Sequence, residues 1–452
     1  MKRSFKQGFF GRSRLSLIFF AVPALFLVSM ILKFHVNVPY YDEWEIPPKL
    51  EKMYSGTIAF HDLWVQHNEH RMVFPRVIIL IFAALSSWDL LWEELFNVAL
   101  AAGTFLLIAG LIRRTRTFTG ESSVFWLTAV ASSVVFSLRQ WENWTWGFEM
   151  VYFMSVFGAV AGIAALSDLR FSWKKWILAF LCGVLSVYSF SSGFVFWPVG
   201  FFLLSISRFR TKRLKSAALV LWVLGAALVM GAYLYGYKKP PKHPSLFYIF
   251  QSPLESMKYF LTYMGSALVV TTRAHWAGAV GTVLFFFTSL FLFFKKKAKR
   301  ELSAGFVALG LFSIGNGLVT TVGRAGFHVE QALTSRYVTI SYPFWIAVIV
   351  LTTMVLKNLE SRAPIKFFDA ELSEIFRKFL CVVIFYLLIK GNYYSIEPMR
   401  QRSELLKRAI PELSRLTEDA DHSLLNSVNP KIEVLKKGSL ILKNRNVSFF
   451  KK

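Results

Sequence analysis

Long apolar runs recur from one end of the chain to the other, and short segments rich in Lys and Arg separate many of them. Most runs approach the roughly 20 residues that a helix needs to cross a bilayer. The pattern therefore predicts an all-α polytopic membrane protein. It predicts about eleven transmembrane helices, at about 15–33, 91–112, 122–138, 150–167, 176–190, 194–207, 216–236, 276–294, 302–321, 338–356 and 379–391.

The basic residues set the expected orientation. They gather at residues 2–14, 113–116, 170–175, 208–215, 295–300 and 357–378. Short loops enriched in Lys and Arg are typical of the cytoplasmic side of a membrane. We therefore expect a multi-pass protein of the inner (plasma) membrane with a cytoplasmic N-terminus. No small-residue cleavage site follows the first apolar run, which predicts an uncleaved first span.

Composition supports this fold class and excludes others. Hydrophobic residues make up 55% of the 452 residues, and the mean hydropathy is +0.46, which is far too apolar for a soluble domain. The formal charge of +25 would suggest nucleic acid in a soluble protein. Here the cations lie in loops between apolar runs and no nucleic-acid motif is present, so we expect membrane lipids and no nucleic acid as partners.

Two regions depart from simple spans. The segment 34–88 is predicted as a long first outer loop in which 73–87 forms a short interfacial helix. Residues 257–272 could also span, but this would place the basic segment 295–300 outside, so we expect them at the interface. The expected domains are a transmembrane domain at 1–391 and a small extracytoplasmic C-terminal tail at 392–452, which caps the outer loops.

The first outer loop carries the densest group of carboxylates and imidazoles, within residues 40–76. Such groups beside a bilayer favour function over a solvated connection, which is the alternative. Asp42 and Glu43 adjoin Trp44, and one of the two, Asp42 by preference, can act as a general base for a hydroxyl acceptor. The alternative for this pair is helix capping or simple solvation.

A second group in the loop is His67, Glu69, His70 and Arg71. If this segment is helical, His67, His70 and Arg71 share one face, which could bind sugar hydroxyls, phosphate or a divalent cation. The candidate metal ligands are Glu43, His67 and His70, and an equally good alternative is a hydrogen-bond network. A cofactor is therefore left open, with Mg²⁺ or Mn²⁺ as candidates.

The later outer loops supply two further groups. Trp141, Glu142 and Asn143 suit a sugar, because the ring can stack on it and the polar groups can bind hydroxyls; the alternative is an interfacial aromatic belt. The other group is cationic and suits a lipid phosphate, with snorkelling to headgroups as the alternative. It consists of Arg324, His328, Arg336 and Tyr337.

Over most of its length the chain resembles the GT-C class of integral-membrane glycosyltransferases, in an uncharacterised bacterial branch. The resemblance lies in YDEW (41–44), DLW (62–64), QHNEHR (66–71), FPR (74–76), QWEN (140–143), GF (147–148), GRAGF (323–327) and SRY (335–337). It implies a polyprenyl-phosphate-linked sugar as donor and Asp42 as catalytic base, with Glu43 as its neighbour or as a metal ligand. The acidic long first loop is the feature shared with the wider class.

We therefore expect transfer of a sugar from a polyprenyl-phosphate donor to a glycan, lipid or protein acceptor on the outer face of the membrane. A glycan polymerase or ligase of the same membrane is the alternative, and it should depend on an Arg or His instead of Asp42. A lipid or solute transporter is a third possibility, although the charges concentrate in loops and the spans are largely Phe, Leu, Val and Ala. A non-catalytic scaffold is the fourth.

Overall fold

The computed structural model describes residues 14–240, 244–294, 297–360, 370–415 and 422–451, and every regular element within these ranges is helical. Seven helical stretches of this part are long and apolar enough to cross a membrane: Leu91–Arg114, Glu121–Trp144, Gly147–Leu166, Lys212–Leu234, Ala274–Phe293, Lys299–Phe327 and Ser335–Glu360. The predicted all-α membrane architecture is confirmed. The total of about eleven spans stays a prediction.

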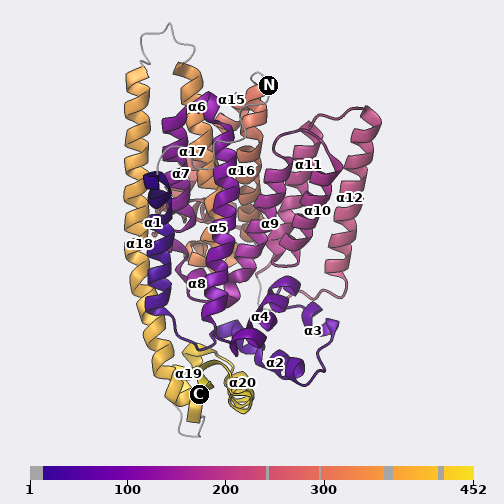
Figure 1. Cartoon of the computed structure of the whole chain (residues 1–452), viewed down its shortest axis with the longest axis vertical. Coiled ribbons are helices and arrows are strands. Elements are labelled where there is room, and N and C mark those ends of the chain that lie inside the picture. Colours follow the sequence, from indigo (N-terminus) through magenta and orange to yellow (C-terminus); the bar gives the residue numbers. More distant parts are fainter. Residues whose placement is uncertain (1–13, 241–243, 295–296, 361–369, 416–421, 452) are drawn as a thin grey trace.

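The long helices lie side by side along the longest axis of the molecule (Figure 1). They are α1 (Arg14–Phe34), α5 (Leu91–Arg114), α7 (Glu121–Val135), α9 (Met150–Leu166), α10 (Trp173–Val187), α11 (Phe196–Ile206), α12 (Lys212–Leu234), α15 (Ala274–Phe293), α16 (Lys297–Arg324), α17 (Val338–Glu360) and α18 (Ala370–Arg415). Short elements join them: α6 (Arg116–Thr119), η2 (Leu138–Gln140), α8 (Trp141–Trp144), η3 (Gly147–Glu149), η4 (Ser191–Val195), α13 (Tyr248–Gln251), η5 (Ala325–Phe327), η6 (Val329–Leu333) and η7 (Ser335–Tyr337).

Burial separates central from peripheral helices. The apolar window of α17 is 94% buried, whereas that of α12 is 28% buried and that of α15 is 33% buried. Leu221, Leu224 and Leu228 of α12 are exposed leucines. Lipid tails solvate such side chains as well as a protein core does, so a spanning helix can be apolar on all faces. These outward surfaces are therefore the lipid-facing surfaces of the bundle.

The helix α14 (Pro253–Gly265) covers much of the ambiguous segment 257–272. Its length is about 20 Å at 1.5 Å per residue, which is shorter than the hydrocarbon core of a bilayer. Two glycines bring it into close contact with α15: a Cβ on Gly265 would lie 1.9 Å from the Ala274 carbonyl oxygen, and one on Gly278 would lie 1.9 Å from that of Leu261. Small residues at this crossing let the two backbones touch.

The two ends of the bundle differ in chemistry. One end, here called the basic end, carries α6 and the turns around Arg170 and Arg208, where Arg208 N–H donates to the Leu169 carbonyl at 2.8 Å. The other, the first-loop end, carries η1 (Tyr41–Glu45), α2 (Pro47–Tyr54), α3 (Phe60–Trp64) and the start of α4 (Val73–Ser86) (Figure 1). The basic segments 1–13, 295–296 and 361–369 lie outside the described residues.

The C-terminal segment packs on the first loop. The helix α18 runs unbroken through residue 391, where the sequence placed a domain boundary, and continues to Arg415. After it come α19 (His422–Val428), α20 (Ile432–Arg445) and η8 (Ser448–Phe450), at the first-loop end (Figure 1). Gly438 of α20 lies against the buried ring of Trp44, and Arg445 forms an ion pair with Glu51 at 2.7 Å.

Candidate functional site

The segment from His67 to His70 is a tight turn and not a helix, which corrects the helical interpretation of this motif. His67 N–H donates to the His70 carbonyl, and His70 N–H donates to the His67 carbonyl, both at 2.8 Å. Asn68 adopts a left-handed conformation with φ 48°, which Asn tolerates better than most residues. Because the turn separates the side chains, His67 and His70 belong to two different groups of contacts.

His67 is held between two carboxylates of η1. Its Nδ1 lies 2.9 Å from Glu45 Oε2, and its Nε2 lies 3.2 Å from Asp42 Oδ2. Burial lowers the pKa of His67, but the hydrogen bonds and charges of Asp42 and Glu45 outweigh it and raise the pKa to about 9. Burial raises the pKa of Glu45, and the stronger influence of His67 lowers it to about 2. His67 and Glu45 therefore carry charge at neutral pH, and the contact with His67 holds the Asp42 carboxylate in position.

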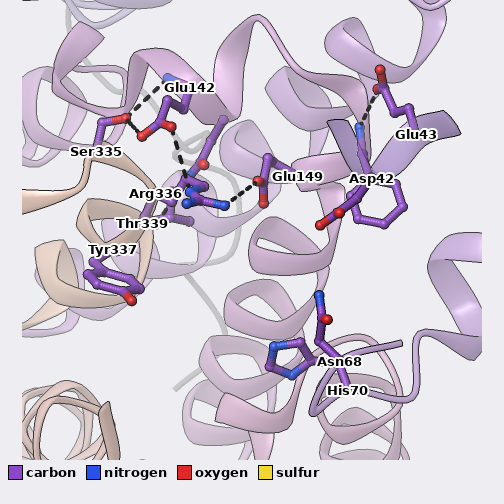
Figure 2. A network of polar contacts seen from close by, with 12 residues as sticks. Asp42, Glu43, Asn68, His70, Glu142, Glu149, Ser335, Arg336, Tyr337 and Thr339 are labelled. Atoms are coloured by element: carbon purple, nitrogen blue, oxygen red, sulfur yellow. Dashed lines mark hydrogen bonds and ion pairs between the residues drawn. The ribbon is translucent and has the colours of Figure 1, made fainter. Parts of the chain in front are cut away.

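Asp42 and Glu43 point in different directions (Figure 2). The Asp42 side chain is 38% exposed. Glu43 is buried, and its two oxygens accept hydrogen bonds from Tyr40 N–H at 2.8 Å and Phe148 N–H at 3.0 Å. Burial and the nearby charge of Glu93 raise the pKa of Glu43 well above its usual value. Glu43 therefore joins the first loop to η3, and Asp42 is the accessible carboxylate of the pair.

Arg336 is the centre of a charged network that joins its own segment to those of Glu142 and Glu149 (Figure 2). Its guanidinium lies 3.7 Å from Glu142 and 3.6 Å from the buried Glu149. Ser335 donates a hydrogen bond to Glu142. Asp42 lies within electrostatic range of Glu149, which places the first loop beside this network. Asp42 and Arg336 therefore meet at the same end of the bundle, although almost 300 residues separate them.

Arg402 of α18 is a member of this network that sequence reasoning missed. Its side chain is 5% exposed and lies 3.8 Å from Glu142. The guanidinium carbon lies 4.5 Å from the ring centroid of Tyr40 and 4.6 Å from that of Trp141, so cation–π contacts hold it between aromatic rings from two loops. Nothing in the local sequence distinguishes Arg402 from the other basic residues of the tail.

A pocket of about 700 Å³ lies beside the network, between the His70 turn and the helices α9, α12 and α16. Its polar lining includes Glu69, His70 and Arg324, and Arg324 forms an ion pair with Glu69. His70 Nε2 lies 3.5 Å from Glu69, and its ring stacks on Phe190 at 3.9 Å. Burial lowers the pKa of His70, which favours the neutral imidazole in this wall.

The remaining lining of this pocket is apolar and reaches the lipid-facing surface. Leu234, Leu246, Leu318 and Val319 line it and are each more than half exposed. On its inner side, Tyr152 and Tyr337 also line the pocket, and both lie within electrostatic range of Arg324 and Arg336. One cavity thus combines a cationic end, a wall next to the charged network and an opening between hydrophobic helices.

The other expected site residues have different surroundings. Arg71 donates to the carbonyl oxygens of Trp64, Tyr233 and Tyr235, so it anchors the loop to the end of α12. Asn143 is buried and donates to the Arg336 carbonyl at 3.1 Å, which holds the loop of Arg336 in place. His328 is exposed and does not line the pocket.

The candidate metal ligands do not converge. Glu43 binds backbone N–H groups, His67 binds Asp42 and Glu45, and His70 faces the pocket. Within the described ranges, no group of three or more His, Cys, Asp or Glu side chains is arranged to hold a metal ion. The cationic side chains that line the pocket are Arg324 and Lys239.

Comparisons with known proteins add one structural similarity. No family model matches the chain, and no curated protein matches it. Among solved structures, it is similar to an archaeal oligosaccharyltransferase, AglB from Archaeoglobus fulgidus, determined in complex with an inhibitory peptide and a dolichol-phosphate. The TM-score is 0.49 at 10% sequence identity, over 92% of this chain and 59% of that protein. Similarity at this level does not establish what the chain acts on.

Proposed function

We propose that the protein is a membrane glycosyltransferase that moves a sugar from a polyprenyl-phosphate donor to an acceptor hydroxyl at the first-loop end. The observation that carries the proposal is the pocket of about 700 Å³, which joins a cationic end to an apolar opening between helices. A polyprenyl phosphate has the matching chemistry, an anionic head on a long apolar chain. The first-loop end is the extracytoplasmic one in this proposal, following the distribution of Lys and Arg.

Arg324 and His70 hold the donor phosphate in this proposal. Arg324 donates to Glu69 from Nη2, and its guanidinium carries further N–H groups that can donate to phosphate oxygens. When the bond between sugar and phosphate breaks, negative charge builds up on the leaving phosphate, and a fixed guanidinium stabilises it. The lipid chain extends along Leu318 and Val319, which line the pocket and are exposed to the lipid side.

Asp42 is the proposed general base. It accepts the proton of the acceptor hydroxyl, and the acceptor oxygen then bonds to the anomeric carbon of the sugar as the bond to phosphate breaks. The contact with His67 at 3.2 Å holds the Asp42 carboxylate in position. Arg336, between Glu142 and Glu149, supports the wall that both substrates face. Trp141 and Glu142 are the proposed contacts for the sugars.

Replacing Asp42 tests the base. In Asp42→Asn we expect transfer to fall by about 10²–10⁴-fold, because the amide cannot accept the proton, with donor binding retained. The measurement is release of polyprenyl phosphate from a synthetic polyprenyl-phosphate hexose in native membranes, alongside binding of polyprenyl phosphate to the purified protein. Asp62→Asn is the matched control, since Asp62 is a carboxylate of the same loop that accepts a hydrogen bond from Lys52.

Arg324→Gln should instead raise the donor KM by about tenfold or more, the size expected for loss of a charge-assisted hydrogen bond.

Full transfer by Asp42→Asn would remove Asp42 from the role of base. Flipping of the lipid in vesicles without an acceptor, with no transfer detected by the wild-type protein, would favour the transporter instead.

A further inference from the structure

A second pocket, of about 520 Å³, lies on the α18 side of the charged network. It is formed by α18, by η2 with the start of α8, and by the segment 268–271 after α14. Arg139 and Trp141 line it from one side, and Lys390 and Gly391 of α18 line it from the other. Trp141 belongs to both the pocket and the network, because its ring lines the pocket and also contacts the Arg402 guanidinium at 4.6 Å.

Arg139 is a buried cation at this pocket. Arg139 is 6% exposed, and its Nη2 donates a hydrogen bond to the Leu333 carbonyl oxygen at 3.0 Å. Its Nε is buried and has no hydrogen-bond partner among the described residues, and no carboxylate of this part of the chain lies within ion-pair distance. Glu142 is the carboxylate within electrostatic range, and Arg336 and Arg402 already share it. A buried charge without a paired anion is costly, so an anionic ligand would compensate it.

The surroundings of the pocket match a lipid headgroup better than a free ion. Residues 382–389 of α18 are apolar, and Val382, Tyr386 and Ile389 are exposed. Charged residues begin at Lys390, which is exposed at the pocket, and continue at Glu397 and Arg400. The pocket therefore lies where the surface of α18 changes from apolar to charged, which is the depth at which a membrane protein meets headgroups.

We propose that this pocket binds the phosphate of an anionic lipid, between Arg139 at its base and Lys390 at its mouth, separately from the donor pocket. The acyl chains lie along the apolar surface of α18. Arg139 also holds the Leu333 carbonyl, only three residues before Arg336. The lipid therefore supports the segment that carries Arg336, and its binding requires neither transfer activity nor the donor.

The test is native mass spectrometry of the purified full-length protein with added phosphatidylglycerol. We expect one phosphatidylglycerol to be retained and diacylglycerol, which lacks the phosphate, to bind at least about tenfold more weakly. Inorganic phosphate at millimolar concentration should not displace the lipid. Arg324→Gln should leave this lipid bound, because Arg324 lies in the other pocket.

Three variants locate the site. Arg139→Gln and Lys390→Gln should each weaken retention by about tenfold. Because Arg139 is buried and its replacement can disturb folding, Gly391→Leu is the sharper test. Gly391 lines the pocket, and a Cβ there meets only Arg139 Cδ, at 3.7 Å, so a larger side chain at this position takes up space in the pocket. Lys407→Gln, on an exposed position of the same helix outside the pocket, is the matched control.

Retention of phosphatidylglycerol by Gly391→Leu and Lys390→Gln at wild-type strength would overturn the proposal. Displacement of the lipid by inorganic phosphate would overturn it as well, because the site would then bind a free anion.

Discussion

Asp42 and Glu43 illustrate how two identical functional groups acquire different properties from their surroundings. They are adjacent in η1, yet Asp42 contacts His67 at the surface, whereas Glu43 is buried against Tyr40 and Phe148 backbone N–H groups. Burial disfavours the charged form of Glu43 and raises its pKa. The sequence makes both carboxylates candidates for the base, but only the environment distinguishes the solvent-facing Asp42 from the buried Glu43.

The contact of His67 with Asp42 and Glu45 predicts a pH dependence. The pKa of His67 is raised from 6.5 to about 9, so its stabilising effect is complete below pH 6.5 and is lost as the pH rises through about 9. The pKa of Glu45 is lowered from 4.5 to about 2, so its effect is complete above pH 4.5 and is lost as the pH falls through about 2.

Thermal unfolding of the purified protein between pH 4 and 10 measures this effect. The Tm difference between wild type and His67→Gln should be largest between about pH 5 and 6.5 and should shrink towards pH 10. His61→Gln, an exposed histidine of the same loop, should match the wild type throughout. A His67→Gln difference that grows above pH 9 would contradict the assigned charge on His67.

At the scale of elements, the single helix α18 both lies along the helix bundle and carries a residue of the charged network, Arg402. At about 69 Å for its 46 residues it is much longer than a bilayer core. Its central part lies along the bundle, and its extension places Arg402 beside Tyr40 and Trp141. The chain then turns back, so that α20 packs on the first loop. The candidate site therefore depends on a helix whose C-terminal half looks, in sequence, like an ordinary polar tail.

The contact between α20 and η1 predicts a specific destabilisation. A Cβ on Gly438 would lie 2.7 Å from Cε3 of the buried Trp44, so Gly438→Val must displace either the tail or a rigid ring. We expect a loss of stability of about 1–3 kcal/mol and faster proteolysis of the tail. Limited proteolysis with thermal unfolding measures both.

Gly231→Ala is the matched control for this change. No atom lies within 4 Å of a Cβ at Gly231, and alanine is the better helix former, so stability should stay equal or rise slightly. Equal protease resistance of Gly438→Val and wild type would show that the tail does not depend on this contact.

For the whole molecule, the decisive property is that the two ends differ. Basic turns lie at one end, and the acidic, aromatic and histidine-rich loops meet at the other (Figure 1). Charge in the turns orients a membrane protein, while the substrates of the proposed reaction must approach from one side only. The proposed function therefore depends on which side of the membrane the first-loop end faces, as well as on the individual site residues.

Orientation can be measured with single cysteines in a variant whose two native cysteines are replaced. Cysteine in place of the exposed Lys436, in α20, should react in intact cells with a membrane-impermeant maleimide, since we expect the first-loop end outside. Cysteine in place of the exposed Lys174, at the basic end, should react only after the membrane is opened. The reverse pattern would place the site on the cytoplasmic side and end the proposal of an extracytoplasmic reaction.

The sequence by itself determined the helical membrane architecture and which loops carry the candidate site residues. It could do so because burying a backbone in lipid requires helices about 20 residues long, and because charged groups are expelled to loops. The groups around Asp42, Glu142, Arg324 and Arg336 were predicted on this ground, and the structure brings them to one end of the bundle.

Only the tertiary structure decided how those groups are paired. It separated His67 from His70 across a turn, engaged Arg71 with backbone carbonyls, left His328 exposed and brought Arg402 into the network. These outcomes depend on contacts between segments far apart in the chain, whose energies follow from burial and distance. Local pattern carries neither quantity, because a charged side chain has the same sequence signature whether it meets solvent, a carbonyl or an ion-pair partner.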